Sequence, residues 1–218
     1  IIHIMSQTIL LLSSGSFLEK NFRLILGRPL KEYKLAHITT AGKGQGVRNL
    51  DYQEKTRNRL RAQECVFEDI DIDGKTEDEL REIFKNFDGV FMNGGSTFYL
   101  LKSIRESGFE KVIKELLPTG FLYMGASAGA YVACPTIEMS NWTERGKYNE
   151  YQITDYTGMS LVPFLVYVHY TPESEALLRE QIPQASLPVH ILTDEQAIIV
   201  RDGVIEFLGE EVKIGEGN

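Results

Sequence analysis

The sequence predicts an α/β fold in which a mostly parallel β-sheet lies between two layers of helices. Apolar segments with the composition of strands alternate with amphipathic segments along most of the chain, as expected for parallel strands joined by helices. The last apolar segments instead follow one another closely and turn at Asp202-Gly203, which predicts a C-terminal antiparallel meander. No repeat, low-complexity tract or linker interrupts the pattern. We therefore expect a single domain over residues 1–218, with residues 1–4 as a leader outside the fold.

The first half of the chain supplies three strand-helix pairs. In the third pair, Thr76 and Glu79 have the spacing of a capping box, which predicts where that helix begins, and its apolar residues recur on one side. The predicted pairs are residues 8–15 with 17–26, 34–42 with 52–64, and 65–72 with 76–87.

The second half continues this pattern and then departs from it. A fourth strand ends in paired glycines, and a fifth runs directly into Ser127. A later strand ends near His169 and is followed by one more helix before the meander. The predicted segments are strand 89–95, helices 97–108 and 110–118, strand 120–125, strand 161–170, helix 171–182 and meander 197–215.

Composition and charge narrow the class of protein. Hydrophobic residues make up 43% of the 218 residues and charged residues 25%, which are values of a globular protein rather than a disordered one. The formal net charge of -8 argues against nucleic acid as a partner, because phosphate binding needs clustered Lys and Arg. No apolar run approaches about 18 residues and no signal-peptide pattern is present, so we expect a cytoplasmic protein with no membrane partner. The sequence leaves the oligomeric state open, a homodimer being one option.

The segment from Phe121 to Pro135 places one serine within a run of small residues, between an apolar strand and a helix. Its GASAG core matches the G-x-S-x-G pattern of a nucleophile elbow, a turn so tight that bulky neighbours would clash. Small residues around a serine also occur in ordinary helix-sheet packing. Ser127 is the predicted nucleophile because the carboxyl ends of the strands would also bring residues 93–97 and His169 to the same rim.

A serine nucleophile needs a base to accept its proton, and the sequence offers four histidines. His3 lies in the leader, and His37 falls inside an apolar strand, where a structural histidine of the core is the more ordinary interpretation. His190 begins a strand with nothing distinctive nearby. His169 ends a strand at the rim where Ser127 is expected, so it is the predicted general base.

A carboxylate that orients the histidine would complete a catalytic triad. Glu144 is the predicted acid, because it lies in a polar stretch that reads as a loop able to fold back over the rim. The alternatives, which the sequence leaves open, are Glu138, Glu150 and Asp155 before His169 and Glu173 just after it.

Acyl transfer also needs N–H donors for the oxyanion. The residue after the nucleophile, Ala128, is one natural donor, and the paired glycines Gly94 and Gly95 can supply the second, since no side chain blocks the approach of a ligand. No cluster of His, Cys and acidic residues has zinc-ligand spacing, so neither a metal nor an organic cofactor is expected.

Three segments resemble the peptidase E group of serine peptidases, which includes aspartyl dipeptidases and cyanophycinase relatives. They are MNGGSTFYLLKSIRESGF, LYMGASAGAYVACPTI and LVPFLVYVHY, in this order. The resemblance implies a fold like that of class I glutamine amidotransferases. It also implies Ser127 as nucleophile, His169 as general base, and Gly95 with Ala128 as oxyanion donors.

The chain departs from the family pattern at several positions. Aspartyl dipeptidases carry an acid one residue after the asparagine that matches Asn141, where this chain has Trp142. Other branches of the family place their carboxylate a few residues later, which falls at Glu144. Ser96 and Tyr131 each replace an asparagine of the family pattern. The preference for an N-terminal aspartate therefore stays open.

These observations predict a serine exopeptidase or dipeptidase that hydrolyses short peptides, with an N-terminal aspartate as one option. An esterase or amidase that uses the same groups on another acyl compound is an alternative. A second alternative is a small-molecule binding protein that kept the elbow and lost the acid, as Trp142 would suggest.

Overall fold

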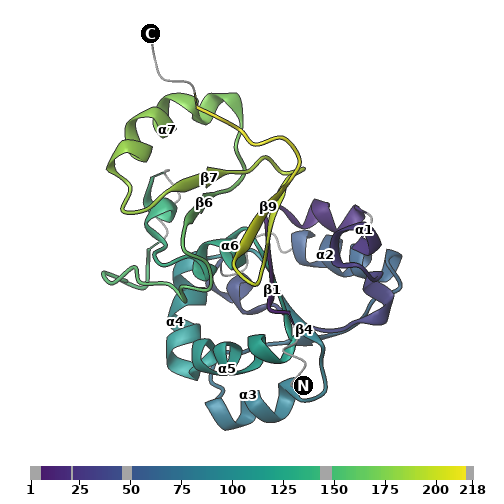
Figure 1. Ribbon diagram of the computed structural model, residues 1–218. Coiled ribbons are helices and arrows are strands. Elements are labelled where there is room, and N and C mark those ends of the chain that lie inside the picture. Colours follow the sequence, from purple (N-terminus) through teal and green to yellow (C-terminus); the bar gives the residue numbers. More distant parts are fainter. Residues whose placement is uncertain (1–5, 21, 46–50, 143–148, 215–218) are drawn as a thin grey trace.

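The structure is a computed structural model that describes residues 6–20, 22–45, 51–142 and 149–214. In this part of the chain, a seven-stranded sheet has the order β3-β2-β4-β5-β1-β8-β9 (Figure 1). Its strands are β1 Thr8–Leu12, β2 Lys34–Ile38, β3 Val66–Ile70, β4 Gly89–Met92, β5 Leu122–Ala126, β8 Ala197–Arg201 and β9 Val204–Leu208.

The direction of the strands confirms the predicted fold class. Strands β1 to β5 pair in parallel, whereas β8 and β9 are antiparallel to their neighbours. The turn between β8 and β9 is Asp202-Gly203, and both residues have positive φ, 48° and 83°, as a type I′ hairpin turn requires. The register sets Leu12 of β1 beside Ala126 of β5, so both strands end at the rim where Ser127 follows.

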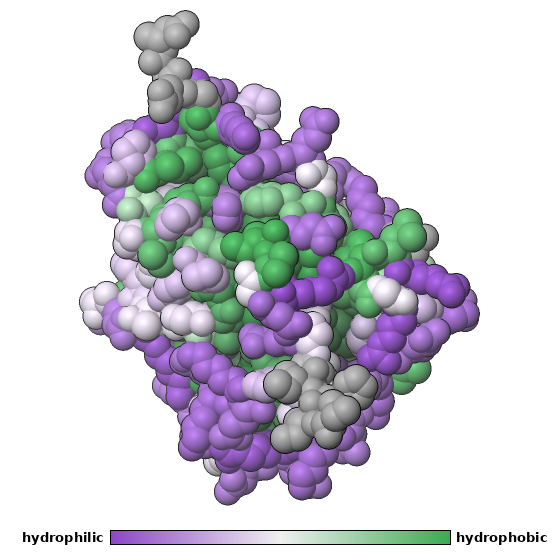
Figure 2. Space-filling view, viewed as in Figure 1, coloured by the Kyte–Doolittle hydropathy of each residue, from purple (hydrophilic) through white to green (hydrophobic). Residues whose placement is uncertain are grey.

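Helices cover both faces of the sheet and bury alternate residues of the central strands on opposite sides, whereas the edge strands β3 and β9 are largely exposed. Ile9 and Leu11 of β1 belong to the core under α3 to α6, whereas Leu10 and Leu12 belong to the core under α1 and α2 (Figure 1). The outer surface over α3 and α5 is mostly hydrophilic, as expected for helices that bury only one stripe (Figure 2). The helices are α1 Phe22–Leu26, α2 Asp51–Ala62, α3 Glu77–Phe84, α4 Thr97–Ser107, α5 Phe109–Leu116, α6 Ala128–Ala133 and α7 Glu175–Gln181.

Three predicted segments differ in the structure. The strand that leads to His169 is short, β6 Leu165–Tyr167, and pairs in parallel with β7 Val189–Ile191 in a separate two-stranded sheet. The meander has two strands rather than three. Its last predicted segment is 211–215, of which the described residues 211–214 form no strand and pack Val212 and Ile214 against the cluster around Tyr167. The predicted helix 17–26 is a 3-10 turn followed by α1.

Candidate active site

Ser127 stands at the sharp turn between β5 and α6 and has strained backbone angles. Its φ of 53° and ψ of -110° are unusual for a residue with a side chain. The small neighbours are required by close packing: a Cβ on Gly125 would lie 2.3 Å from the carbonyl oxygen of Gly129, and one on Gly129 would lie 2.3 Å from that of Met92. The turn therefore has the crowded geometry that the GASAG pattern predicts for a nucleophile elbow.

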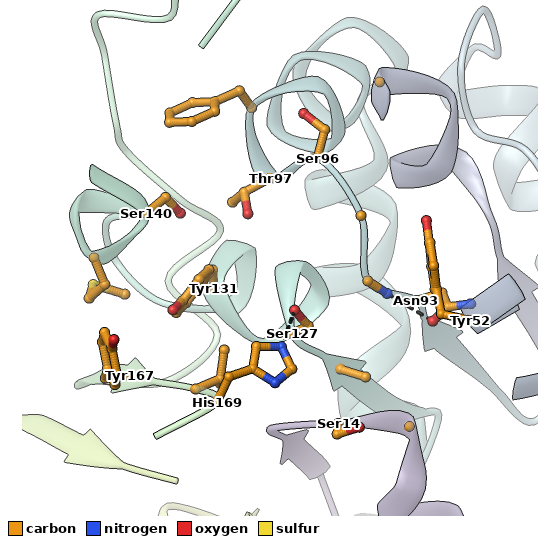
Figure 3. Close-up of a pocket in the computed structure, with 18 of the residues that line it drawn as sticks. Ser14, Tyr52, Asn93, Ser96, Thr97, Ser127, Tyr131, Ser140, Tyr167 and His169 are labelled. Carbon is orange, nitrogen blue, oxygen red and sulfur yellow. Dashed lines mark hydrogen bonds between the residues drawn. The ribbon is translucent and has the colours of Figure 1, made fainter. Parts of the chain in front are cut away.

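His169 lies against Ser127 at the same rim (Figure 3). Its Nε2 is 2.8 Å from Ser127 Oγ. The residue also has a positive φ, 60°, and its backbone N–H donates a 2.7 Å hydrogen bond to the Oγ of Ser13 at the end of β1. This bond holds the segment after β6 against the main sheet, although among the described strands β6 itself pairs with β7 alone.

The carboxylate next to His169 belongs to Asp194, which follows β7. Asp194 Oδ1 lies 2.6 Å from His169 Nδ1 and accepts a 3.0 Å hydrogen bond from the Ser13 hydroxyl. A carboxylate on Nδ1 favours the tautomer with the proton on Nδ1, which leaves the Nε2 lone pair facing the serine hydroxyl. Serine, histidine and aspartate are thus arranged as in a serine-hydrolase triad.

The predicted acid, Glu144, lies outside the described residues. The alternatives that are described lie elsewhere: Glu138 accepts hydrogen bonds from the backbone and side chain of Ser186, and Asp155 pairs with Arg105 at 3.2 Å. Glu150 lines the cavity described below, and Glu173 is exposed. Both ring nitrogens of His169 are already partnered, by Ser127 and Asp194.

Trp142, the residue that raised the question of a lost acid, stacks on the ring of Tyr167, with centroids 6.3 Å apart and an interplanar angle of 17°. It fills space beside β6. With Asp194 on His169, Trp142 gives no reason to infer that the acid has been lost.

Asp194 is not among the acids that the sequence predicts, because those end just beyond His169. One signal could have found it. Residues 189–191 read as a short strand, and Thr193 and Asp194 follow its carboxyl end. β6 and β7 pair in parallel with Tyr167 opposite Ile191, so the residues just after each strand, His169 and Asp194, meet at one edge.

Two backbone N–H groups are available beside Ser127. Gly95 has a φ of 141°, and a Cβ there would lie 2.5 Å from the backbone of Ala41, so only glycine fits. A Cβ on the preceding Gly94 would lie 3.2 Å from Ser127 Cβ, which shows how closely this turn approaches the nucleophile. Within the described part of the chain, the N–H groups of Gly95 and Ala128 have no hydrogen-bond partner, whereas that of Gly94 is bound by Asn93 Oδ1 at 2.8 Å.

A cavity of about 1220 Å³ surrounds the serine and extends to both sides of it (Figure 3). Of the described residues that line it, Arg59 is the only Lys or Arg. Hydroxyl groups are abundant among the lining residues, which include Ser14, Tyr52, Ser96, Thr97, Tyr131, Ser140 and Tyr167. Their number favours a polar ligand over a purely apolar one.

Among the described residues, no group of three or more His, Cys, Asp or Glu side chains is placed to hold a metal ion. In the same residues, no helix combines the length and apolar character needed to cross a bilayer.

Comparisons with known proteins identify the family and the fold. The chain is 30% identical over 190 residues to peptidase E of Nostoc sp., which covers 81% of this chain and 73% of the relative. It is 27% identical over 192 residues to an uncharacterized peptidase of Pasteurella multocida, covering 87% of each chain. A solved structure of a candidate peptidase E from Listeria monocytogenes has a TM-score of 0.80 at 23% identity, covering 95% of this chain and 100% of that one, and so shows the same fold. The pattern of peptidase family S51 matches residues 9–208, and the chain therefore belongs to peptidase family S51.

Proposed function

We propose that this chain is a cytoplasmic serine exopeptidase or dipeptidase that hydrolyses short peptides, including peptides with an N-terminal aspartate. The observation that carries the proposal is the pair of contacts on His169, 2.8 Å to Ser127 Oγ and 2.6 Å to Asp194, at a cavity large enough for a short peptide. Asp194 takes the role that the sequence suggested for Glu144.

In this mechanism, Ser127 Oγ attacks the carbonyl carbon of the scissile peptide bond while His169 Nε2 accepts the hydroxyl proton. Asp194 stabilises the imidazolium that forms. The N–H groups of Gly95 and Ala128 bind the oxyanion, and each such donor contributes about 10²- to 10³-fold in rate. His169 then gives the proton to the leaving amine, and a water molecule activated by His169 releases the acyl group from Ser127.

The preference for short peptides is supported by Arg59, which would bind a free C-terminal carboxylate. Arg59 lies on α2, donates a 2.7 Å hydrogen bond to Glu19 and is 26% exposed. Its Nη1 lies 4.0 Å from the position that a Cβ would take on Gly15, so the absence of a side chain there leaves room beside the guanidinium. A guanidinium is suited to carboxylates because it can donate two parallel hydrogen bonds.

A polar side chain on the acyl residue of the substrate is supported by Ser140. This residue is 6% exposed and lines the cavity, and its Oγ has no hydrogen-bond partner among the described residues (Figure 3). Leaving a buried hydroxyl unpaired costs about 1–3 kcal/mol, a cost that a substrate group would remove on binding. A hydroxyl can donate to a carboxylate or an amide, so aspartate and asparagine are both suitable partners.

The function is tested by incubating the purified protein with a panel of dipeptides and their C-terminal amides. We expect hydrolysis by the parent protein, a higher KM for the amides, and a loss of about 10⁴-fold or more in kcat for Ser127→Ala. Ser160→Ala is a matched control, because Ser160 also has a positive φ, 51°, but does not line the cavity. No peptide release by the parent, together with no labelling of Ser127 by a fluorophosphonate, would favour a binding protein. Cleavage of esters alone would favour an esterase.

The role of Ser140 is tested by comparing Ser140→Ala with Ser103→Ala. In the described parts of the chain, the Oγ of each of these two buried serines has no hydrogen-bond partner, but of the two only Ser140 lines the cavity. We expect Ser140→Ala to raise KM about tenfold for Asp-X and Asn-X dipeptides, and Leu-X dipeptides to be affected little, since the lost hydrogen bond is worth about 1.4 kcal/mol. Ser103→Ala should leave every KM unchanged. Equal KM values for Ser140→Ala and the parent would remove Ser140 from substrate recognition.

A further inference from the structure

A series of side-chain contacts leads from the surface of the sheet to the turn beside Ser127. Arg57 Nε donates to Asp69 Oδ2 at 2.8 Å, and Asp69 Oδ1 lies 2.7 Å from His37 Nδ1. On the other side of the ring, His37 Nε2 lies 3.0 Å from Asn93 Nδ2. Asn93 Oδ1 in turn accepts the backbone N–H of Gly94 at 2.8 Å. This series of contacts crosses three neighbouring strands, β3, β2 and β4, and ends at Gly94, one residue before Gly95.

The central side chains in this series of contacts, those of His37 and Asn93, are buried away from solvent. The side chain of His37 is 0% exposed and Asn93 is 3% exposed. The His37 ring lies between Phe67 and Phe91, with centroids 5.9 and 5.8 Å away. Both ring nitrogens have partners, which confirms the expectation that His37 is a structural histidine of the core.

The contacts fix the direction of every hydrogen bond. A carboxylate only accepts, so His37 Nδ1 carries the proton and donates to Asp69. Burial, which disfavours the imidazolium, outweighs the attraction of Asp69 and lowers the pKa of His37, so Nε2 has no proton and accepts from the Asn93 amide. The Asn93 side chain must then present its oxygen to Gly94. A turned amide would set two donors against each other at Gly94 and two acceptors against each other at His37.

The held peptide is adjacent to a proposed oxyanion donor. Because Asn93 Oδ1 occupies the N–H of Gly94, the next N–H along the chain, that of Gly95, is the one without a partner among the described residues. The backbone of Asn93 is itself fixed, since its N–H donates to the carbonyl oxygen of Ile38 at 3.1 Å. The orientation of one amide side chain thus sets which N–H of the glycine pair remains available.

We propose that His37 is a positioning residue for the oxyanion-binding turn: with Asp69 it orients the Asn93 side chain, which holds the Gly94 peptide so that the Gly95 N–H faces the reacting carbonyl oxygen. His37 does not touch the substrate and transfers no proton. The proposal rests on the proposed peptidase function, and its test has one readout that does not require activity.

The readout without activity is ¹⁵N NMR of the intact protein. We expect the His37 imidazole to show the tautomer with the proton on Nδ1, and Asn93→Ala to shift the amide resonances of both Gly94 and Gly95. A proton on Nε2, or unshifted glycine amides in Asn93→Ala, would overturn the proposal even if the protein proved not to be a peptidase. If these NMR results are obtained but the parent protein hydrolyses no peptide, the proposed function fails and the positioning of the turn stands.

The kinetic readout is a double-mutant cycle. Loss of a whole oxyanion donor costs about 10²- to 10³-fold, so for a misplaced donor we expect a smaller loss, about tenfold in kcat with little change in KM, in either His37→Phe or Asn93→Ala. If the two residues act as one unit, the double variant should lose about tenfold rather than a hundredfold. Ser107→Ala is the control, because it removes a buried hydroxyl on α4 that bonds to Ser103 far from the turn. A hundredfold loss in the double variant, or a change in KM alone, would overturn the proposal.

Discussion

The protein contains two histidines with the same pattern of partners and different surroundings. His169 has the Asp194 carboxylate 2.6 Å from Nδ1 and the Ser127 hydroxyl 2.8 Å from Nε2. His37 has the Asp69 carboxylate 2.7 Å from Nδ1 and the Asn93 amide 3.0 Å from Nε2. In both pairs the carboxylate fixes the tautomer of the ring and leaves Nε2 as an acceptor.

The difference lies in what Nε2 can accept and in access to solvent. The His169 side chain is 26% exposed at the cavity and faces a hydroxyl whose proton it could take, whereas His37 is sealed and faces an amide that cannot give up a proton at neutral pH. The same histidine-carboxylate pair is therefore suited to proton transfer in one place and only to orientation in the other. A histidine-carboxylate contact alone does not identify a catalytic base.

The largest expected effect that separates the two pairs comes from neutralising each carboxylate. Asp194→Asn should lower kcat by about 10⁴-fold with little change in Tm, because the wrong tautomer of His169 would be favoured while the packing stays intact. Asp69→Asn should lower kcat by only about tenfold but reduce the free energy of unfolding by about 1–3 kcal/mol, since it weakens hydrogen bonds to a buried group. Steady-state kinetics and urea unfolding measure both quantities.

Glu144→Gln belongs in the same experiment, since Glu144 was the acid expected from the sequence. With Asp194 as the acid, this variant should keep kcat within about threefold of the parent. A loss of several orders of magnitude in Glu144→Gln, with Asp194→Asn unaffected, would restore Glu144 to the mechanism and remove Asp194.

A smaller effect should appear in the pH dependence of stability. Burial lowers the pKa of His37, so below about pH 6.5 the unfolded chain binds a proton there that the folded protein does not bind. Stability should therefore fall as the pH drops from 6.5, by at most about 1.4 kcal/mol at pH 5.5 for this one group.

Burial also lowers the pKa of His190, whose contribution to the pH dependence of stability has the same sign. At lower pH, the Asp69 carboxyl adds to the loss. Burial alone would raise its pKa, but the hydrogen bonds from His37 and Arg57 outweigh burial and lower it.

The contribution of His37 to this pH dependence is measured by urea unfolding of the parent and of His37→Phe at pH 7.5, 6.5 and 5.5. The slope of stability against pH should be shallower in the variant over this range. Equal slopes would mean that His37 titrates alike in the folded and unfolded chain, and the contrast between the two histidines would then fail.

The main elements of the fold could be predicted from the sequence because each carries its own local signal. The capping box at Thr76 and Glu79 is present, with the Thr76 side chain accepting from Glu79 N and the Glu79 side chain accepting from Thr76 N. The segment after β9 could not be assigned, because apolar alternation at Val212 and Ile214 looks the same whether the residues pair with a strand or pack on a cluster.

The sequence can place a residue of the candidate site where neighbouring residues carry a local pattern, and it cannot place one whose position depends on pairing between distant segments. Small residues on both sides of Ser127 predict its turn, and a strand end predicts His169 at the rim. The approach of Asp194 depends on the parallel pairing of β6 with β7, for which residues 165–167 and 189–191 are too short to give a clear pattern. The link between His37 and Asn93 likewise depends on β2 lying beside β4.

The buried hydroxyl of Ser13 has a consequence for how the molecule is made. It joins the end of β1, which lies beside the strand that leads to Ser127, to the later segments of His169 and Asp194. The three side chains of the candidate triad therefore come together only after those later segments have been made. A ribosome would release the serine of the elbow well before it has synthesised the aspartate that orients the histidine. We therefore expect the growing chain to be inert and hydrolytic competence to arise only after the late segments have folded onto the sheet.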